Sequence, residues 1–256
     1  FGRMNLEGSY WRLDRIRAIG DEPTRNPNIS MLNDHIVLNR CLLEMGGGGA
    51  GQISVGANGK GLPSNYGVVQ HCVVRNTQIS SGDDNHAIKV SLGHYNRIVH
   101  NEIYNFAGDG IQFGDGPTEF KGSVIYDNDI YIDPSTYEPG SVSKVPHENG
   151  IDIKAAGGSG AGDHILIAKN RFRNLGKTPG GTSPNADQGA IDHSNSGQQK
   201  SYVLIEDNVF YECRVPFNTK GGFLSDHYTI RRNLMYKANR FGIWIAKDTE
   251  DHHDIY

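Results

Sequence analysis

The sequence predicts an all-β protein whose chain winds into a single-stranded right-handed parallel β-helix. Short segments with alternating apolar residues recur along the chain, asparagine recurs at one position of this repeat, and glycine is abundant, with 33 among 256 residues. The repeat is clearest over residues 94–116, where two short alternating segments flank an Asn-Glu-Ile corner. Two such strands cannot bury their apolar faces alone, so each copy needs another copy above and below it.

The first segment of the repeat ends in a corner that predicts a side-chain ladder. The copies are spaced by roughly 25 to 40 residues, because loops of different length interrupt a constant coil. Stacked amides at the corner can bond one another and the nearby backbone groups, so we expect one buried column. Its members are Cys41, Cys72, Asn101, Asn128, Asn170, Asn208 and Asn233.

The second segment follows each corner and gives about seven to eight visible coils. The repeat leaves no room for a second unit, so we predict a single β-helix domain over residues 1–256. No amphipathic helix precedes the first strands at residues 8–20, and residues 252–256 read as the start of another coil. We therefore expect truncation at one or both ends. The copies of the second segment are residues 52–55, 87–90, 111–113, 151–154, 191–193, 217–220 and 243–245.

Composition narrows the classes of partner. The formal charge of −4 argues against a nucleic-acid-binding protein, which normally presents a basic face. No apolar run is long enough to span a membrane. Cys41 and Cys72 fall on adjacent rungs of the corner, where we expect free, buried thiols rather than a disulfide.

From Gly8 to Ile245 the repeat and its asparagine corner resemble the pectate-lyase-like superfamily of carbohydrate-active β-helices. The resemblance implies a polysaccharide partner and a secreted or periplasmic location. It does not select one activity, because this repeat serves lyases, hydrolases, epimerases and non-catalytic spikes alike.

Two insertions, residues 131–148 and 175–188, emerge side by side from consecutive coils and are expected to wall a groove. Strand alternation places one polar side chain per coil outward on this face, and coils lie about 4.8 Å apart. We therefore predict one exposed column; a solvated sheet face is the competing explanation. The column consists of Lys89, Gln112, Asp152, Asp192 and Asn218, and the substrate-binding candidates are Lys89, Gln112, His147, Asn218 and Trp244.

Acids and bases converge on this face, which favours β-elimination on a uronic-acid polysaccharide. A base removes the proton beside the sugar carboxylate once a hard cation or Arg/Lys neutralises that carboxylate. Similar β-helix lyases combine Ca²⁺ with a Lys or Arg base, so the resemblance points the same way. The candidate Ca²⁺ ligands are Glu148, Asp152, Asp187 and Asp192, with direct neutralisation by Lys or Arg as the competing account. The catalytic candidates are Lys154, Lys220, Arg214 and His193, of which His193 faces inward if alternation is strict.

Two partial resemblances keep other activities open. Residues 81–89 resemble the Asp-Asp segment of polygalacturonases, whose paired carboxylates invert a glycosidic bond, but the Gly-His-Gly and Arg-Ile-Lys segments of that family are absent. Residues 146–148 resemble the Asp-Pro-His-Asp/Glu motif of mannuronan epimerases, with Val145 in place of the Asp and Val142 in place of a Tyr. The alternatives to a lyase are a glycoside hydrolase and a non-catalytic glycan-binding or tail-spike β-helix.

Overall fold

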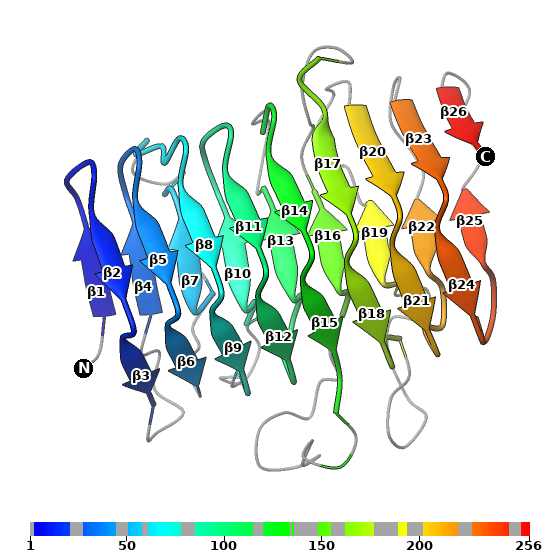
Figure 1. Cartoon of the computed structure of the whole chain (residues 1–256), viewed down its shortest axis with the longest axis horizontal. Helices are drawn as coiled ribbons and strands as arrows, with labels where there is room; N and C mark the ends of the chain where they lie inside the picture. Colours follow the sequence, from blue (N-terminus) through cyan, green and yellow to red (C-terminus); the bar gives the residue numbers. More distant parts are fainter. Residues whose placement is uncertain are drawn as a thin grey trace.

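The computed structural model describes most of the chain as short β-strands joined by tight corners (Figure 1). Within the described residues, no helix is long and apolar enough to span a lipid bilayer. The described residues are 3–20, 28–44, 51–57, 61–77, 85–114, 120–133, 135, 148–154, 162–176, 189–193, 202–219, 227–245 and 252–256.

The strands form three parallel sheets, and each full coil contributes one strand to each of them (Figure 1). Sheet 1 contains β1 (Arg3–Leu6), β4 (Asn28–Met31), β7 (Ile53–Val55), β10 (Ile88–Val90), β13 (Ile111–Phe113), β16 (Ile151–Ile153), β19 (Ile191–His193), β22 (Phe217–Thr219) and β25 (Ile243–Ile245). Sheet 2 contains β2 (Arg12–Asp14), β5 (Val37–Asn39), β8 (Val68–Gln70), β11 (Arg97–Val99), β14 (Val124–Tyr126), β17 (Ile165–Ala168), β20 (Tyr202–Glu206), β23 (His227–Arg231) and β26 (His252–Ile255). Sheet 3 contains β3 (Arg17–Ile19), β6 (Leu42–Glu44), β9 (Val73–Arg75), β12 (Glu102–Tyr104), β15 (Asp129–Tyr131), β18 (Arg171–Arg173), β21 (Val209–Tyr211) and β24 (Leu234–Tyr236).

The parallel β-helix is confirmed, but its coils differ from the prediction in two respects. The sequence predicted two strands per coil and about seven to eight coils, whereas in the described part of the chain sheet 1 has nine strands and eight coils have a third strand in sheet 3. The third strand follows the corner at once, as β12 follows Asn101. No loop residue separates this strand from the corner, so residues 101–103 were taken together as the corner.

The core fills the inside of the helix with residues that stack on their own kind from coil to coil. Ile98 pairs in register with Ile125, and both are buried. Phe172 and Phe210 stack with their ring centroids 4.9 Å apart. In-register stacking buries each apolar side chain against its counterpart one coil away, which is the packing that the repeat predicted.

The predicted corner column between sheets 2 and 3 is confirmed. Asn128 Nδ2 donates to Asn170 Oδ1 and to the Ile98 carbonyl, both at 2.9 Å, while Asn128 Oδ1 accepts from the Asn101 N–H at 2.9 Å. The ladder ends at Asn233, which is only half-buried. At its other end Cys41 and Cys72 are free and buried, as predicted.

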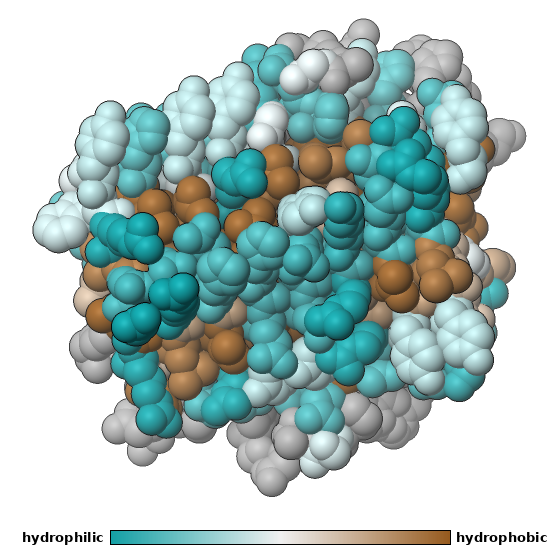
Figure 2. Space-filling model, in the orientation of Figure 1, coloured by the Kyte–Doolittle hydropathy of each residue, from teal (hydrophilic) through white to brown (hydrophobic). Residues whose placement is uncertain are grey.

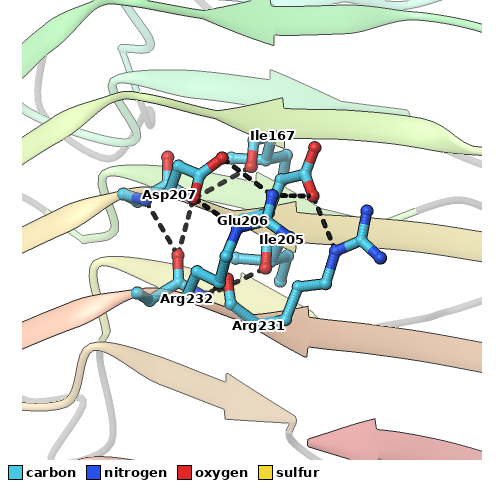
Figure 3. Close-up of polar contacts among 8 residues, drawn as sticks. Ile167, Ile205, Glu206, Asp207, Arg231 and Arg232 are labelled. Atoms are coloured by element: carbon cyan, nitrogen blue, oxygen red, sulfur yellow. Dashed lines mark hydrogen bonds and ion pairs between the residues drawn. The ribbon is translucent and has the colours of Figure 1, made fainter. Parts of the chain in front are cut away.

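The residue before each rung of this ladder takes a left-handed backbone conformation, with φ between 52° and 58°. Most of these side chains point into solvent, and a hydrophilic band crosses the middle of the face of sheets 2 and 3 (Figure 2). In the last coils opposite charges pair across rungs: Arg232 Nε donates to Asp207 Oδ1 at 2.8 Å, and Arg231 Nε donates to Glu206 Oε2 at 2.7 Å (Figure 3). These exposed pairs add little stability, but they neutralise the corner charge locally.

Candidate functional site

The outward side chains of sheet 1 form one register column, as predicted. Residue by residue, Lys89 pairs with Gln112, and Gln112 pairs with Asp152. Asp152 then pairs with Asp192, and Asp192 pairs with Asn218. The column also extends beyond the predicted set, to Ser54 and Ser30 in one direction and to Trp244 in the other.

The prediction that this column is exposed is wrong. Lys89 is 7% exposed, and Gln112 and Asp192 are fully buried. All three residues of β10, β13, β16, β19 and β22 are buried, whereas strands of sheets 2 and 3 such as β8 and β12 bury only their middle residue. Alternation determines the side to which a residue points but not what lies over it. A solvated sheet face therefore does not describe this column.

Asp109 anchors the column at the start of β13. Its Oδ2 accepts from Gln112 Nε2 at 3.0 Å, and its Oδ1 accepts from the backbone N–H and Nδ2 of Asn149 at 3.1 Å and 2.9 Å. His86 Nδ1 lies 3.2 Å from Asp109 Oδ2. Burial alone would raise the pKa of Asp109, but the His86 hydrogen bond and charge, the Lys154 charge and the Asn149 hydrogen bond outweigh it and lower that pKa. Asp109 is therefore a carboxylate at neutral pH.

The network of Asp109 with His86 and Asn149 was not predicted from the sequence. A usable signal existed. His86, Asp109 and Asn149 occupy equivalent positions, two residues before the apolar start of a sheet 1 strand. All three are buried, so a polar residue recurring just before an apolar triplet marked a second polar column.

Lys154 joins this network from the other end of the strand. Its Nζ lies 3.5 Å from Asp152 Oδ2, and its side chain is 26% exposed, against 3% for Asp152. One coil beyond, Asn218 Nδ2 donates to Asp192 Oδ1 at 2.7 Å. The structure thus brings Lys154, Asp152 and Asp109 together, with Lys154 at the partly exposed edge.

The remaining predicted site residues are less closely connected. Glu148 and Arg214 are both half-buried at the corner that precedes sheet 1. Glu148 lies just before β16 and Arg214 just before β22, so the two residues are two coils apart. Trp244 is half-buried, and its ring lies under the Arg240 guanidinium, with the guanidinium carbon 4.9 Å from the ring centroid. Lys220, His147 and Asp187 lie outside the described residues.

His193 is a correction to the predicted catalytic set. It stands in register with Ile153 and Thr219, whose positions face the interior, and it is 2% exposed. Its ring contacts Tyr228 edge-on, with centroids 5.3 Å apart. Strict alternation therefore holds at this position, and His193 is a core residue that does not face the column.

The described residues fit a Ca²⁺ ion poorly. Ca²⁺ takes six to eight oxygen ligands, and no group of three His, Cys, Asp or Glu side chains in the described ranges is close enough to hold a metal. Asp152 already faces an ammonium group, and Asp192 accepts from an amide. The Ca²⁺ site stays a prediction, because Asp187 lies outside the described residues.

The comparisons with known proteins rest on structure alone, since no family model and no curated protein matches the sequence. The pectate lyase Pel9A is similar with a TM-score of 0.55 and 14% identity over 96% of this chain. An alginate lyase from Paenibacillus sp. str. FPU-7 is similar with a TM-score of 0.42 and 12% identity. The match covers 95% of this chain and 91% of the lyase chain. PfbA, a surface adhesin of Streptococcus pneumoniae, is similar with a TM-score of 0.35 and 11% identity. The match covers 87% of this chain and 64% of the adhesin chain.

This chain spans 55% of the length of Pel9A, and at 14% identity the likeness shows the fold alone. Three all-parallel sheets, an asparagine corner ladder and the match to Pel9A agree with one another. The chain has a right-handed parallel β-helix fold, which it shares with Pel9A.

Proposed function

We propose that this protein is a polysaccharide lyase that cleaves a uronic-acid polysaccharide by β-elimination on the face of sheet 1. The observation that carries the proposal is the buried polar column with the partly exposed Lys154 at its edge. Burying such polar side chains costs free energy unless each one is hydrogen-bonded within the protein or to a ligand. The fold shared with Pel9A, a pectate lyase, supports an acidic polysaccharide as the substrate class, and we propose a secreted or periplasmic location.

In this proposal Lys154 is the base that removes the proton beside the sugar carboxylate. Lys89, two coils before Lys154, or Arg214, two coils after it, provides the positive charge that neutralises that carboxylate, which lowers the cost of forming the carbanion-like transition state. In the free protein the Lys154 ammonium faces Asp152 at 3.5 Å. Because the base must be neutral to accept a proton, bound substrate has to separate this pair, and activity should rise with pH. Lys220 stays the alternative base.

The test is a screen of polygalacturonate and alginate that follows the absorbance of unsaturated product and, separately, new reducing ends. Lys154→Ala should lower turnover by roughly 10²- to 10⁴-fold if Lys154 is the base. Lys169→Ala is the matched control, because Lys169 stands at the corner between sheets 2 and 3 with its ammonium 5.4 Å from the centre of the Tyr126 ring. Reducing ends without unsaturation would identify a hydrolase, and full activity in both Lys154→Ala and Lys220→Ala would exclude this lyase mechanism.

Non-catalytic glycan binding is the second candidate, favoured by an exposed aromatic row at the corner between sheets 1 and 2. Tyr10, His35, Tyr66 and Tyr95 stack in sequence with centroid distances of 4.8, 5.0 and 5.1 Å. All four residues are exposed, and they belong to four consecutive coils. Retention of a polysaccharide that is lost in a Tyr66→Ala variant, with no cleavage product, would support this function.

A further inference from the structure

The corner between sheets 2 and 3 carries different charge patterns in its two halves. The residues that precede the last four asparagine rungs alternate in sign, and Arg232 Nε pairs with Asp207 Oδ1 at 2.8 Å. They are Asp127, Lys169, Asp207 and Arg232. The same position in the first four coils holds no acid. Its residues there are Arg15, Arg40, His71 and His100. The first half of the corner is therefore basic.

Four arginines gather at the first two coils of this corner. We call them the arginine corner, and they are Arg12, Arg15, Arg17 and Arg40. All four are exposed, and Figure 2 shows strongly hydrophilic side chains over β2 and the turn into β3. Within the described ranges none of them forms an ion pair, whereas Arg171, Arg173 and Arg231 in the later coils each pair with an acid. Asp14, between Arg12 and Arg15 in the sequence, accepts instead from Asn39 Nδ2.

This arrangement costs stability. Arg15 and Arg40 occupy matching positions one coil apart, because Asp14 pairs in register with Asn39, and neighbouring coils lie about 4.8 Å apart. Like charges directly opposite each other on neighbouring strands are destabilising. The backbone does not require arginine here, since Asp127 takes the same left-handed conformation, with φ of 52° against 54° for Arg40. A carboxylate at either position would relieve the repulsion, and so would a bound anion.

The shape of this basic surface suits one narrow anionic chain. Its charges follow the helix axis, and a guanidinium fork binds a carboxylate through two parallel hydrogen bonds. The basic run covers four coils, about 15 Å, and ends at Asp127, whose Oδ2 lies 2.9 Å from His100 Nδ1. The protein carries a net charge of −4, so a broad polyanion such as duplex DNA would be repelled outside this strip. The chemistry that fits is a single flexible chain with repeated carboxylates.

We propose that the arginine corner is a second, non-catalytic binding site for an acidic polysaccharide that lies along the helix axis. Each coil runs from sheet 1 to sheet 2, through this corner, and on to sheet 3, so both sheets separate the site from the face of sheet 1 (Figure 1). A polymer held here anchors the protein while the face of sheet 1 is free for another segment. This inference rests on the proposed function only in taking the polyanion to be a glycan.

Binding is tested by calorimetry at low salt with polygalacturonate and alginate, each as the free polyanion and as a neutral ester. The wild-type protein should bind a polyanion and bind its ester much more weakly. Arg40→Glu should bind the polyanion about tenfold more weakly, the loss of one charge-assisted hydrogen bond. The matched control is Arg171→Glu, which changes the net charge equally at a 66% exposed side chain that already contacts Asp129 Oδ2 at 3.4 Å; it should bind like the wild type.

The repulsion is tested without any ligand. Arg40→Glu places a carboxylate beside Arg15 and restores the alternation of charge, so this variant should melt at a higher temperature than the wild type in low salt. The difference should shrink in about 1 M salt, where the Debye length is about 3 Å. A melting temperature equal to or below that of the wild type in low salt would overturn the uncompensated charge and with it the reason for an anionic ligand. Arg40→Gln, which only removes the charge, gives the same comparison if glutamate impairs folding.

The outcomes separate this inference from the proposed function. Binding that depends on Arg40 without unsaturated product would support the inference and contradict the lyase. Unsaturated product with unchanged binding in Arg40→Glu would support the lyase and overturn the inference. Equal binding of polyanion and ester, tighter binding of single-stranded DNA, or no binding of either polymer would also overturn it. If the protein cleaves, Arg40→Glu should leave the turnover of short oligosaccharides unchanged, and a loss of turnover would contradict a non-catalytic site.

Discussion

Replacing Asn128 by leucine tests the corner ladder at its centre. Asn128 takes part in four side-chain hydrogen bonds. It donates to the Ile98 carbonyl and to Asn170 Oδ1, both at 2.9 Å, and accepts from the backbone N–H and Nδ2 of Asn101 at 2.9 Å and 3.0 Å. Asn101 Nδ2 keeps a second partner in the Val69 carbonyl, and Asn170 Oδ1 keeps the backbone N–H of residue 128.

Leucine would thus leave two buried backbone groups, the Asn101 N–H and the Ile98 carbonyl, without the partners they have now. Each such group costs about 1–3 kcal/mol, so the polar loss is about 2–6 kcal/mol. Burial of the larger apolar side chain offsets about 1.5–3 kcal/mol of this. We therefore expect Asn128→Leu to lower the free energy of unfolding by about 1–3 kcal/mol.

Guanidinium denaturation followed by circular dichroism measures this difference, with the midpoint and the slope compared between variant and wild type. The control is Asn239→Leu, at an exposed position outside the ladder, which should change stability by less than about 0.5 kcal/mol. A loss for Asn128→Leu as small as that of the control would show that the ladder does not stabilise the corner and would refute this reasoning.

Three further predictions concern the Cys72 rung of the corner column, the pKa of Asp109 and the Ca²⁺ site. Cys72→Asn should raise the melting temperature, because an amide at this rung can bond Asn101 and the Cys41 N–H, which now meets only a sulfur at 3.4 Å; a lower melting temperature contradicts this. Since the pKa of Asp109 is lowered in the folded protein, its stabilisation is present above the ordinary carboxyl pKa of about 3.9 and is lost as pH falls through the folded value. Asp109→Asn should therefore be less stable than wild type at pH 7, and thermal melts should show the gap closing below about pH 4. Calorimetry of chelator-treated protein with Ca²⁺ should give no heat if Lys154 neutralises Asp152 directly, and a stoichiometric heat would favour the Ca²⁺ site.

The features that the sequence predicted well are local and repeated. The corner column could be found because five coils place an asparagine two residues after the end of their sheet 2 strand, as Asn170 and Asn208 do. The register of the sheet 1 column followed from counting along each strand, and strict alternation correctly warned that His193 points inward. Periodicity of this kind survives loops of any length, because each coil repeats the same short pattern.

Other features depend on contacts between coils and could not be predicted. The third strand was missed because it follows the corner directly, so its first residues were assigned to the corner. The burial of Lys89 and Gln112 was missed because alternation says nothing about what covers a face. The orientation of the Gln112 amide depends on Asp109, whose own position is set by Asn149 one coil away. Such a chain of contacts becomes visible only in three dimensions.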